Sequence, residues 1–257
     1  MLIILKKTLL YILIVIIKKY FVKIISSAFV FFILVTIAIP SVAFNAGNIF
    51  FGESKVLYNI NLAHFFYKQA AYPIFFTQPP RYAHHELSRT YFIQGKLDKA
   101  LEEAEKELEI YPDDTSTYYI LGLTLAYMNR THEAIDAFSK YIDTHPGTWA
   151  GRNDKAWLQF RIGDINSALV TLEPVAKTFT FTPWVQNTYC ALLIAKKKYE
   201  EALEPCINAK NAVEKMTVKD WGHAYPGNDP RIYNDGLEAT KTSVNQNVEL
   251  INKNRKK

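Results

Sequence analysis

Apolar residues recur along much of this chain with the spacing of a helix that buries one face. Between positions 97 and 108, Leu97, Ala100, Leu101, Ala104 and Leu108 form one apolar stripe. Glutamate and lysine side chains fill the positions between them. An apolar residue at every third or fourth position is typical of an amphipathic helix. The pattern therefore predicts a helix here, with its charged face in solvent.

The helical pattern returns at a fixed interval of 34 residues. Four segments, beginning at Arg81, Thr115, Trp149 and Pro183, align without gaps. Within each segment, position 8 is a small residue, position 20 is alanine and position 15 is mostly glycine or asparagine. These residues are Ser88, Gly122, Ala156 and Cys190 at position 8; Ala100, Ala134, Ala168 and Ala202 at position 20; and Gly95, Asn129, Gly163 and Lys197 at position 15. A constant period of this length is the signature of a repeat architecture.

Each of these positions has a physical meaning. Small residues at positions 8 and 20 allow two antiparallel helices to approach closely. Glycine or asparagine at position 15 can adopt a left-handed backbone conformation and end the first helix. Pro112 and Pro146, at position 32, stop the second helix. Each segment is therefore predicted to fold as a helical hairpin, and Pro174 predicts a kink or an early end in the third.

With the Leu121–Gly122 pair, these positions resemble the tetratricopeptide repeat family over residues 81–216. The resemblance implies an all-α fold, a right-handed α-solenoid of antiparallel helix pairs. Its repeats would be 81–114, 115–148, 149–182 and 183–216, and residues 44–80 resemble a degenerate extra repeat.

The remaining residues, 217–257, predict a loop and a C-terminal capping helix with a basic tail. Thr217 to Asp220 fits a capping box, and the loop would run from Trp221 to Asp229. The buried side of the last helix would carry Ile232, Leu237, Val244, Val248 and Ile251.

The first 43 residues differ from the rest in charge. They contain five lysines and no acidic residue, whereas the remainder carries 25 basic and 25 acidic residues. Residues 24–39 are uncharged, and with Pro40 to Ala43 they approach the roughly 20 residues that span a bilayer. We predict a basic and apolar segment at 1–23 and a transmembrane helix at 24–43. The excess of basic residues therefore belongs to the N-terminus and is no evidence for a face that binds nucleic acid, and we expect no nucleic-acid partner.

The distribution of lysines predicts the topology of this single-pass protein. Lysines precede the apolar segment and none follows before Lys55, so the N-terminus would be cytoplasmic and the repeats extracytoplasmic. Ser41 to Ala43 also fits a signal cleavage site, which would make the protein secreted after cleavage near Ala43. The shorter apolar run from Thr8 to Ile17 would lie at the membrane interface, and the topology would invert if it spanned.

The sequence contains no motif that indicates catalysis. Gly47 to Gly52 has the spacing of a phosphate-binding loop, but Glu53 follows where that loop needs lysine. His84 and His85 are neighbours on a predicted helix and point in different directions, which disfavours a metal site. Cys190 and Cys206 fall at positions 8 and 24 of the fourth repeat. We favour two core thiols there, although an extracytoplasmic location would allow a disulfide. We expect no enzyme, cofactor or metal.

The resemblance implies a binding groove on the first helix of each repeat, at positions 2, 5, 9, 12 and 13. The sixteen residues at these positions are rich in aromatic side chains and carry few charges. Aromatic and arginine side chains are the usual anchors of protein interfaces. The sixteen are Tyr82, His85, Arg89, Phe92, Tyr119, Leu123, Ala126, Tyr127, Asn153, Trp157, Phe160, Arg161, Trp184, Asn187, Ala191 and Ile194. The lysine–asparagine clamp of some relatives is not matched, since only Arg89 is basic at a ninth position. Some aromatics, such as Trp157 and Phe160, would instead pack between repeats.

These observations predict a membrane-tethered scaffold that binds a protein or peptide ligand in its groove. One alternative is an accessory subunit or an enzyme with a site in the 221–231 loop. Polar and aromatic residues cluster in that loop: Trp221, His223, Tyr225, Asn228, Asp229 and Arg231. Another alternative is a structural array that associates with itself as a homo-oligomer.

Overall fold

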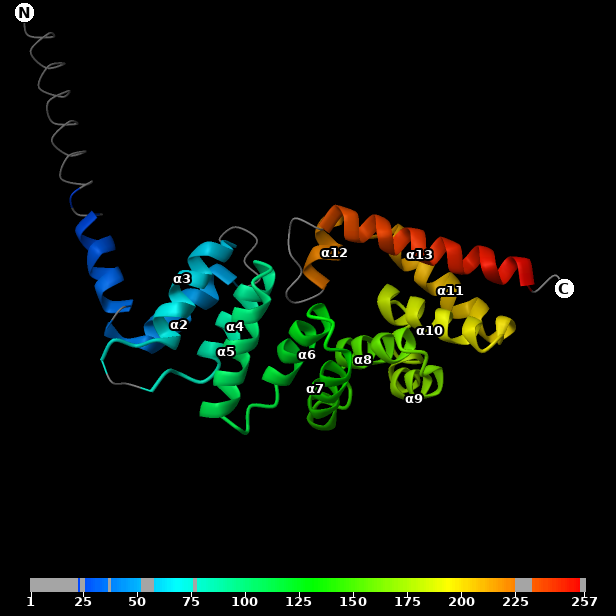
Figure 1. The fold of residues 1–257 in the computed structure, drawn as a ribbon. Coiled ribbons are helices and arrows are strands. Elements are labelled where there is room, and N and C mark those ends of the chain that lie inside the picture. Colours follow the sequence, from blue (N-terminus) through cyan, green and yellow to red (C-terminus); the bar gives the residue numbers. More distant parts are fainter. Residues whose placement is uncertain are drawn as a thin grey trace, which may run out of the picture. The chain divides into compact units, whose positions relative to one another are not determined.

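The computed structural model describes residues 23, 26–36, 38–51, 58–75, 78–224 and 233–254. Regular structure in these residues is helical throughout, which confirms the predicted all-α class (Figure 1). The chain forms two compact units, residues 1–83 and 84–257.

The second unit contains four helical hairpins in succession (Figure 1). The first helices of the hairpins are α4 (Ala83–Ile93), α6 (Thr117–Tyr127), α8 (Trp149–Arg161) and α10 (Pro183–Ala195). The second helices are α5 (Leu97–Ile110), α7 (Thr131–Thr144), α9 (Ile165–Ala176) and α11 (Tyr199–Glu214). Three residues connect the two helices of every hairpin. The constant period in the sequence therefore corresponds to a constant connection in the structure.

The four connecting turns share one backbone conformation. Their central residues, Gly95, Asn129, Gly163 and Lys197, have φ angles of 71°, 60°, 84° and 60°. In the first turn, the N–H of Gly95 donates to the carbonyl of Phe92 and that of Lys96 donates to Tyr91; the other three turns repeat both bonds. This pair of bonds is the Schellman motif, which satisfies the last carbonyl groups of a helix. The left-handed conformation predicted for glycine or asparagine at position 15 is thus confirmed in three hairpins, and Lys197 adopts it in the fourth, where the sequence did not predict it.

Positions 8 and 20 lie where the two helices of a hairpin approach each other. Ala100, Ala134, Ala168 and Ala202 are fully buried. In the first hairpin, the Ser88 hydroxyl donates to the carbonyl of Ala100 across the gap, at 2.7 Å. In the second, a methyl group added at Gly122 would lie 2.8 Å from the ring of Phe138. Small residues are therefore required here by the distance between the helices.

Prolines lie near the ends of three of the second helices, whereas α11 contains Pro205 and still extends over 16 residues. Helices α5 and α7 end two residues before Pro112 and Pro146. Helix α9 contains Pro174 and ends at Ala176, after 12 residues against 14 in α5 and α7. The predicted early end agrees with this shorter helix, since proline lacks an N–H and its ring crowds the preceding turn.

Two further helices, α12 (Val218–Ala224) and α13 (Tyr233–Asn254), follow the repeats. The capping box is confirmed: Thr217 N–H donates to Asp220 and Asp220 N–H donates to the Thr217 hydroxyl, both at 3.1 Å. The predicted loop is wrong from Trp221 to Ala224, where α12 continues. Trp221 is buried against Gly236 of α13, which gives this short helix a place to pack. Helix α13 packs on α10 and α11. Its predicted apolar face is buried at Leu237, Val244 and Ile251.

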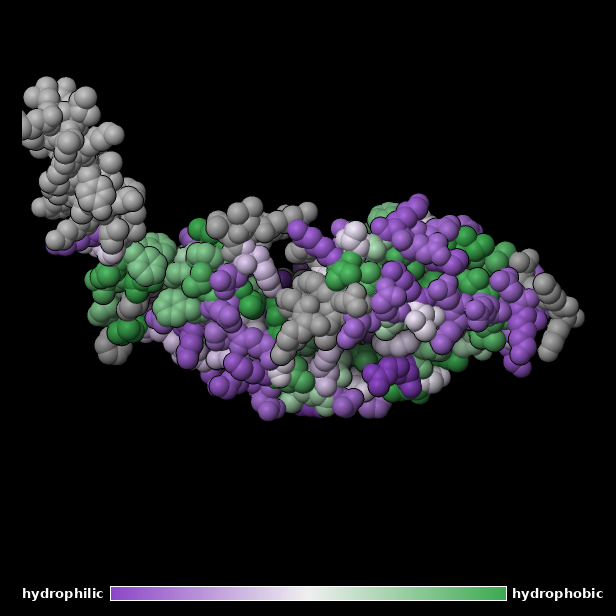
Figure 2. All heavy atoms as spheres, turned by 90° about the horizontal axis from the view of Figure 1, so that it is seen from above, coloured by the Kyte–Doolittle hydropathy of each residue, from purple (hydrophilic) through white to green (hydrophobic). Residues whose placement is uncertain are grey.

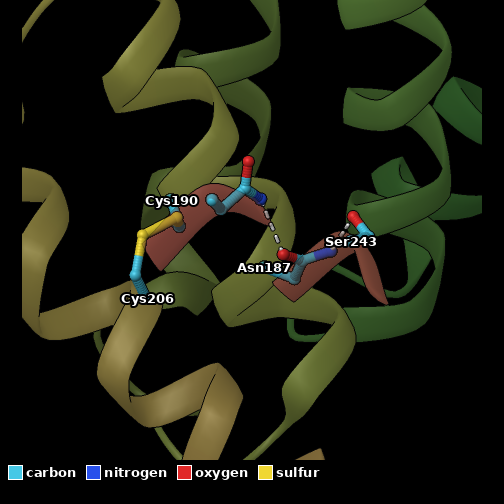
Figure 3. Close-up of a disulfide and its surroundings, with 5 residues drawn as sticks. Asn187, Cys190, Cys206 and Ser243 are labelled. Atoms are coloured by element: carbon cyan, nitrogen blue, oxygen red, sulfur yellow. Dashed lines mark hydrogen bonds between the residues drawn. A yellow bond between two sulfur atoms is a disulfide. The ribbon is translucent and has the colours of Figure 1, made fainter. Parts of the chain in front are cut away.

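A disulfide joins Cys190 of α10 to Cys206 of α11, with the two Cα atoms 5.2 Å apart (Figure 3). The expectation of two free core thiols is therefore wrong. Positions 8 and 24 face each other across the hairpin, within the separation of about 7 Å that a disulfide can bridge. The repeat pattern predicted that the two cysteines lie on facing helices, but it could not predict the distance between their side chains.

The first unit contains a helix, Ser26–Thr36, followed by α2 (Pro40–Phe51) and α3 (Ile60–Ala71). Helices α2 and α3 pack together, although α2 begins at Pro40, four residues before the predicted degenerate repeat at 44–80. A methyl group added at Gly47 would lie 2.6 Å from the ring of Tyr67, whose hydroxyl donates to Asn48 at 2.9 Å. Glycine thus again marks the point of closest approach.

The predicted transmembrane segment at 24–43 is not one helix in the described residues. Ser26–Thr36 and Pro40–Phe51 are bent by 115° relative to each other. Taken alone, neither these nor any other helix in the described residues is long and apolar enough to cross a bilayer, although the bent pair together has the length and composition. The first unit nonetheless carries exposed apolar side chains, among them Phe29, Phe31 and Phe75. Hydrophobic residues gather on the face of this unit that Figure 2 shows.

Candidate functional site

Predicted groove residues come together where α8 and α10 meet α13. A pocket of about 320 Å³ lies between these three helices. Four of the predicted groove residues, Asn153, Trp157, Trp184 and Asn187, contribute to its walls. The described residues that line it are Asn153, Asp154 and Trp157 of α8, Trp184, Asn187 and Thr188 of α10, and Ala239, Thr240 and Ser243 of α13. The pocket therefore needs the capping helix as well as two repeats.

Hydrogen bonds hold α13 against α10 beside this pocket. The Asn187 side-chain amide donates to the Ser243 hydroxyl at 3.1 Å, and its carbonyl accepts from Asn247 at 2.9 Å (Figure 3). Helix α13 is also held by α12, where the Trp221 indole N–H donates to the Thr240 hydroxyl at 3.1 Å. These contacts fix the third wall of the pocket. Asn187 is thus partly engaged within the protein rather than entirely open to a ligand.

Two tryptophan rings, Trp157 of α8 and Trp184 of α10, line the pocket. Trp184 is half-buried and stacks on Trp149, with ring centroids 6.0 Å apart. Trp157 leans on Phe160 at 5.6 Å and keeps 43% of its surface exposed. The alternative that aromatics pack between repeats therefore describes Trp184 better than Trp157.

One carboxylate, that of Asp154, lies on the pocket wall. It accepts a hydrogen bond from the Tyr119 hydroxyl of α6 at 3.0 Å, and one from the Asn153 amide at 3.3 Å. The pKa of Tyr127 is raised, first by burial and second by the charge of Asp154. The charge on Asp154 therefore acts on α6 as well as on its own helix.

The predicted groove residues of the first repeat are engaged with other side chains. Arg89 lies 2.9 Å from both carboxylate oxygens of Glu86, and burial raises the pKa of Glu86 although Arg89 opposes this. His85 forms a hydrogen bond with the Thr117 hydroxyl at 2.8 Å. Burial, with the Arg89 charge second, lowers the pKa of His85 to about 3, so this imidazole is neutral near pH 7. In the first repeat, therefore, His85 carries no positive charge near pH 7 and the charge of Arg89 is paired with that of Glu86.

The other predicted groove residues divide into buried and exposed positions. Leu123 is only 8% exposed and belongs to a core cluster with Phe138. Phe92 and Tyr127 meet edge to face at 5.0 Å, and Tyr127 stays 59% exposed. Arg161 is exposed at the end of α8. Tyr82 belongs to the first unit, where it is exposed and has a left-handed backbone with φ of 71°.

Sequence reasoning missed the residues that α13 contributes. Gly236, Thr240, Ser243 and Asn247 follow one another at intervals of four, three and four residues. This spacing places small and polar side chains on one helical stripe. The stripe was a usable signal for a face that contacts the repeats. Asp154 was also missed, since it stands at a position that the family pattern does not assign to the groove.

The structure shows no metal site in the part of the chain that it describes. No group of three or more His, Cys, Asp or Glu side chains there is arranged to hold an ion. The alternative site in the 221–231 loop lies largely outside the described residues, since residues 225–232 and the side chain of His223 are not among them. Trp221, which is described, packs with Ala209 and Val213 of α11 and with Leu237 and Val244 of α13.

Comparison with known proteins identifies the repeat type. Residues 82–114 and 115–146 match the family model described as tetratricopeptide repeat. The chain is also 24% identical, over 139 residues, to the BBSome complex member BBS4 of Bos taurus. That match covers 54% of this chain and 26% of the relative, so the chain spans about a quarter of the relative's length.

Solved structures show the same fold over a longer stretch. A structure of MamA (AMB-1) has a TM-score of 0.54 at 18% identity and covers 70% of this chain and 94% of that one. YrrB, described as a TPR protein with an unusual peptide-binding site, has a TM-score of 0.54 at 17% identity. This match covers 70% of this chain and 88% of that one. At these identities the likeness concerns the fold. Residues 82–114 and 115–146 are therefore tetratricopeptide repeats, within a longer all-α helical repeat array.

Proposed function

We propose that this protein is a scaffold that holds a segment of another protein against the first helices of its repeats. The observation that carries the proposal is the pocket between α8, α10 and α13, which opens beside the exposed ring of Trp157. Its walls combine aromatic rings with amide and hydroxyl groups, the mixture with which protein interfaces bind side chains and backbone groups.

The tetratricopeptide match supports this reading, because such repeats generally act as non-enzymatic scaffolds. YrrB, which shares the fold, is described as having a peptide-binding site. Between chains of such low identity, the fold alone does not fix the ligand. The proposal for this chain therefore rests on its own pocket.

Site-specific photocross-linking tests the scaffold function. A photoreactive phenylalanine analogue is placed at Trp157 in the full-length protein, expressed in its native cells. The matched control carries the same analogue at Val170, which is 74% exposed on α9 and does not line the pocket. We expect a defined protein adduct from position 157 that is absent from position 170 and weakened by Trp184→Ala. Identical adducts from both positions, or none from position 157, would contradict a groove that binds protein.

We also propose that residues 24–43 attach the protein to a membrane, with the repeats on the extracytoplasmic side. The exposed apolar side chains of helix Ser26–Thr36 favour contact with lipid over contact with water, since large exposed apolar patches usually mark an interaction site. The Cys190–Cys206 disulfide supports an oxidising compartment. Cleavage near Ala43, which would release the protein, is the alternative.

Membrane fractionation distinguishes these two fates. An attached protein stays in the membrane pellet after alkaline carbonate extraction and keeps its N-terminus. External protease would then digest the repeats in spheroplasts or in vesicles of matching orientation. A soluble protein whose N-terminus is Phe44 would instead establish cleavage and contradict the tether.

A further inference from the structure

A second pocket lies outside the groove, at the connection between the third and fourth repeats. The third repeat has Thr180 at position 32, where the first two repeats have proline. Residues 177–182 connect α9 to α10 there, and a pocket of about 460 Å³, the α11 pocket, lies between this connection and α11. None of the described residues that line it also lines the pocket between α8, α10 and α13. The α11 pocket is therefore a separate site.

The connection is held in place by α10. Gln186 is buried, and its side-chain amide donates to the carbonyls of Ala176 at 2.7 Å and Phe179 at 3.2 Å. The Thr182 N–H also donates to the Phe179 carbonyl, at 3.2 Å. These bonds fix the backbone on both sides of Phe181, whose ring stays 73% exposed beside the pocket. Exposed aromatic rings on a fixed backbone are common anchors of protein interfaces.

The opposite wall is formed by the last turns of α11 and the residues that follow it. Asn208, Asn211 and Lys215 follow one another at intervals of three and four residues, which places them on one side of the helix. Lys215 is exposed, and it is the only charged residue among the described ones that line the pocket. The Lys210 ammonium group lies 2.5 Å from the Glu214 carboxylate, whereas Lys215 forms no ion pair within the described residues. The α11 pocket therefore presents a positive charge to a ligand.

This lining favours one class of ligand. Lysine and asparagine side chains both donate hydrogen bonds, and the charge of lysine strengthens the bond to a carboxylate. Phe181 and Met216 add apolar surface beside these groups, against which an apolar side chain can pack. A single lysine lacks the series of positive charges with which proteins hold a nucleic-acid backbone. The lining thus fits an acidic residue next to an apolar one on a protein segment.

We infer that the α11 pocket binds an acidic segment of a partner protein, at a point where aspartate or glutamate stands next to an apolar side chain. Lys215 pairs with the carboxylate, and Asn208 and Asn211 donate hydrogen bonds beside it. Phe181 and Met216 pack on the apolar side chain. The inference goes beyond the proposed scaffold function, because it adds a second binding site to which the groove does not contribute. A chain with both sites holds two protein segments at once.

Selection from a random peptide library tests this chemistry. Full-length protein in detergent micelles is immobilised and exposed to phage that display random nonapeptides, and the bound peptides are sequenced. The selection uses the variant Trp157→Ala, which weakens the groove at a residue that does not line the α11 pocket. We expect one position of the selected peptides to be enriched in aspartate or glutamate, with an apolar residue beside it.

Two substitutions separate the charged contact from the apolar one. For a selected peptide, Lys215→Gln should lower the affinity roughly three- to tenfold, as expected for a charged contact that stays partly exposed. It should also remove most of the loss of affinity that added salt causes, since salt screens exposed charges. Phe181→Ala should lower the affinity as well but leave its salt dependence unchanged.

The control variants separate binding from folding. Lys219→Gln makes the same chemical change at an exposed position of α12 outside the pocket, and should leave the affinity unchanged. Lys215→Glu should shift the selected residue from acidic to basic, a change of specificity that an unfolded protein cannot produce. Circular dichroism checks that each variant is folded.

Failure of this inference is distinguishable from failure of the scaffold function. Selected peptides without an acidic residue would overturn the inference, and so would acidic peptides that bind Lys215→Gln as tightly as the parent protein. A library that yields no enriched peptide would overturn it too. Photocross-linking from position 157 tests the groove separately, so an adduct there without any acidic peptide would leave the scaffold function standing and remove the second site.

Discussion

The second and fourth repeats fill the same space in different ways. Positions 8 and 24 face each other across a hairpin, and the second repeat places Gly122 and Phe138 there. The fourth repeat places Cys190 and Cys206 at these positions and joins them by a disulfide. In the second repeat, the Phe138 ring fills the space beside Gly122. In the fourth repeat, a disulfide bond crosses the corresponding space between the two helices. The family pattern thus constrains the combined volume of the pair rather than either residue alone.

The disulfide lies in the hairpin that packs against the capping helix α13. Cys190 and Cys206 share a core cluster with Ile251 of α13. Asn187, one turn before Cys190 on α10, carries the hydrogen bonds to α13 (Figure 3). The hairpin that supports the capping helix, and with it one wall of the pocket, is therefore the one fixed by a disulfide. The comparison predicts that packing dominates stability in the second repeat and the cross-link dominates in the fourth.

Phe138→Ala should cause the largest loss. Phe138 is fully buried, and its removal leaves a cavity beside Gly122, which has no side chain to fill it. We expect the free energy of unfolding, measured by urea titration with circular dichroism, to fall by about 3–5 kcal/mol. Phe181→Ala, at a residue 73% exposed, should change it by less than about 0.5 kcal/mol. Similar losses in the two variants would refute the packing account of the second repeat.

Reduction of the disulfide should have the next largest effect. The bond closes a sequence separation of 16 residues, and loops of this length stabilise by about 3 kcal/mol through the unfolded state. Dithiothreitol should lower the free energy of unfolding by that order in the parent protein. The double variant Cys190→Ala, Cys206→Ala should show no response to dithiothreitol. If the parent also fails to respond, the fourth repeat does not depend on its cross-link.

The sequence predicts the features that the two repeats share, but not how their side chains at positions 8 and 24 pair. The 34-residue period, the left-handed turns and the alanines at position 20 follow from backbone geometry, which every hairpin shares. The pairing of positions 8 and 24 depends on the distance between side chains on different helices, so the disulfide was misjudged. The end of the pocket formed by α13 was missed for the same reason: Ser243 meets Asn187 across 56 residues of sequence.

Gly122→Ala tests the second repeat from the other side of the pair. The added methyl group would lie 2.8 Å from the Phe138 ring, so the ring or the helix must move. We expect a loss of about 1–3 kcal/mol in the free energy of unfolding. Gly147→Ala, where no atom lies within 4 Å of the new methyl group, is the matched control. Combining Gly122→Ala with Phe138→Leu should recover part of the loss, and strict additivity of the two changes would argue against their contact.

The smallest effect concerns the turns that make the two hairpins comparable. Lys197 holds the left-handed conformation that Gly95 and Gly163 adopt without strain. A left-handed backbone destabilises a residue with a side chain by about 1–2 kcal/mol. Glycine avoids this strain but lowers the free energy of unfolding by about 0.4–1 kcal/mol, because it gives the unfolded chain more conformational entropy. Lys197→Gly should therefore stabilise the protein by about 0.5–1 kcal/mol in urea titration. Lys196→Gly, one residue earlier at φ of −83°, removes the same charge but no such strain and should destabilise instead. A gain from both variants would mean that charge among these lysines, rather than the turn, limits the fourth hairpin.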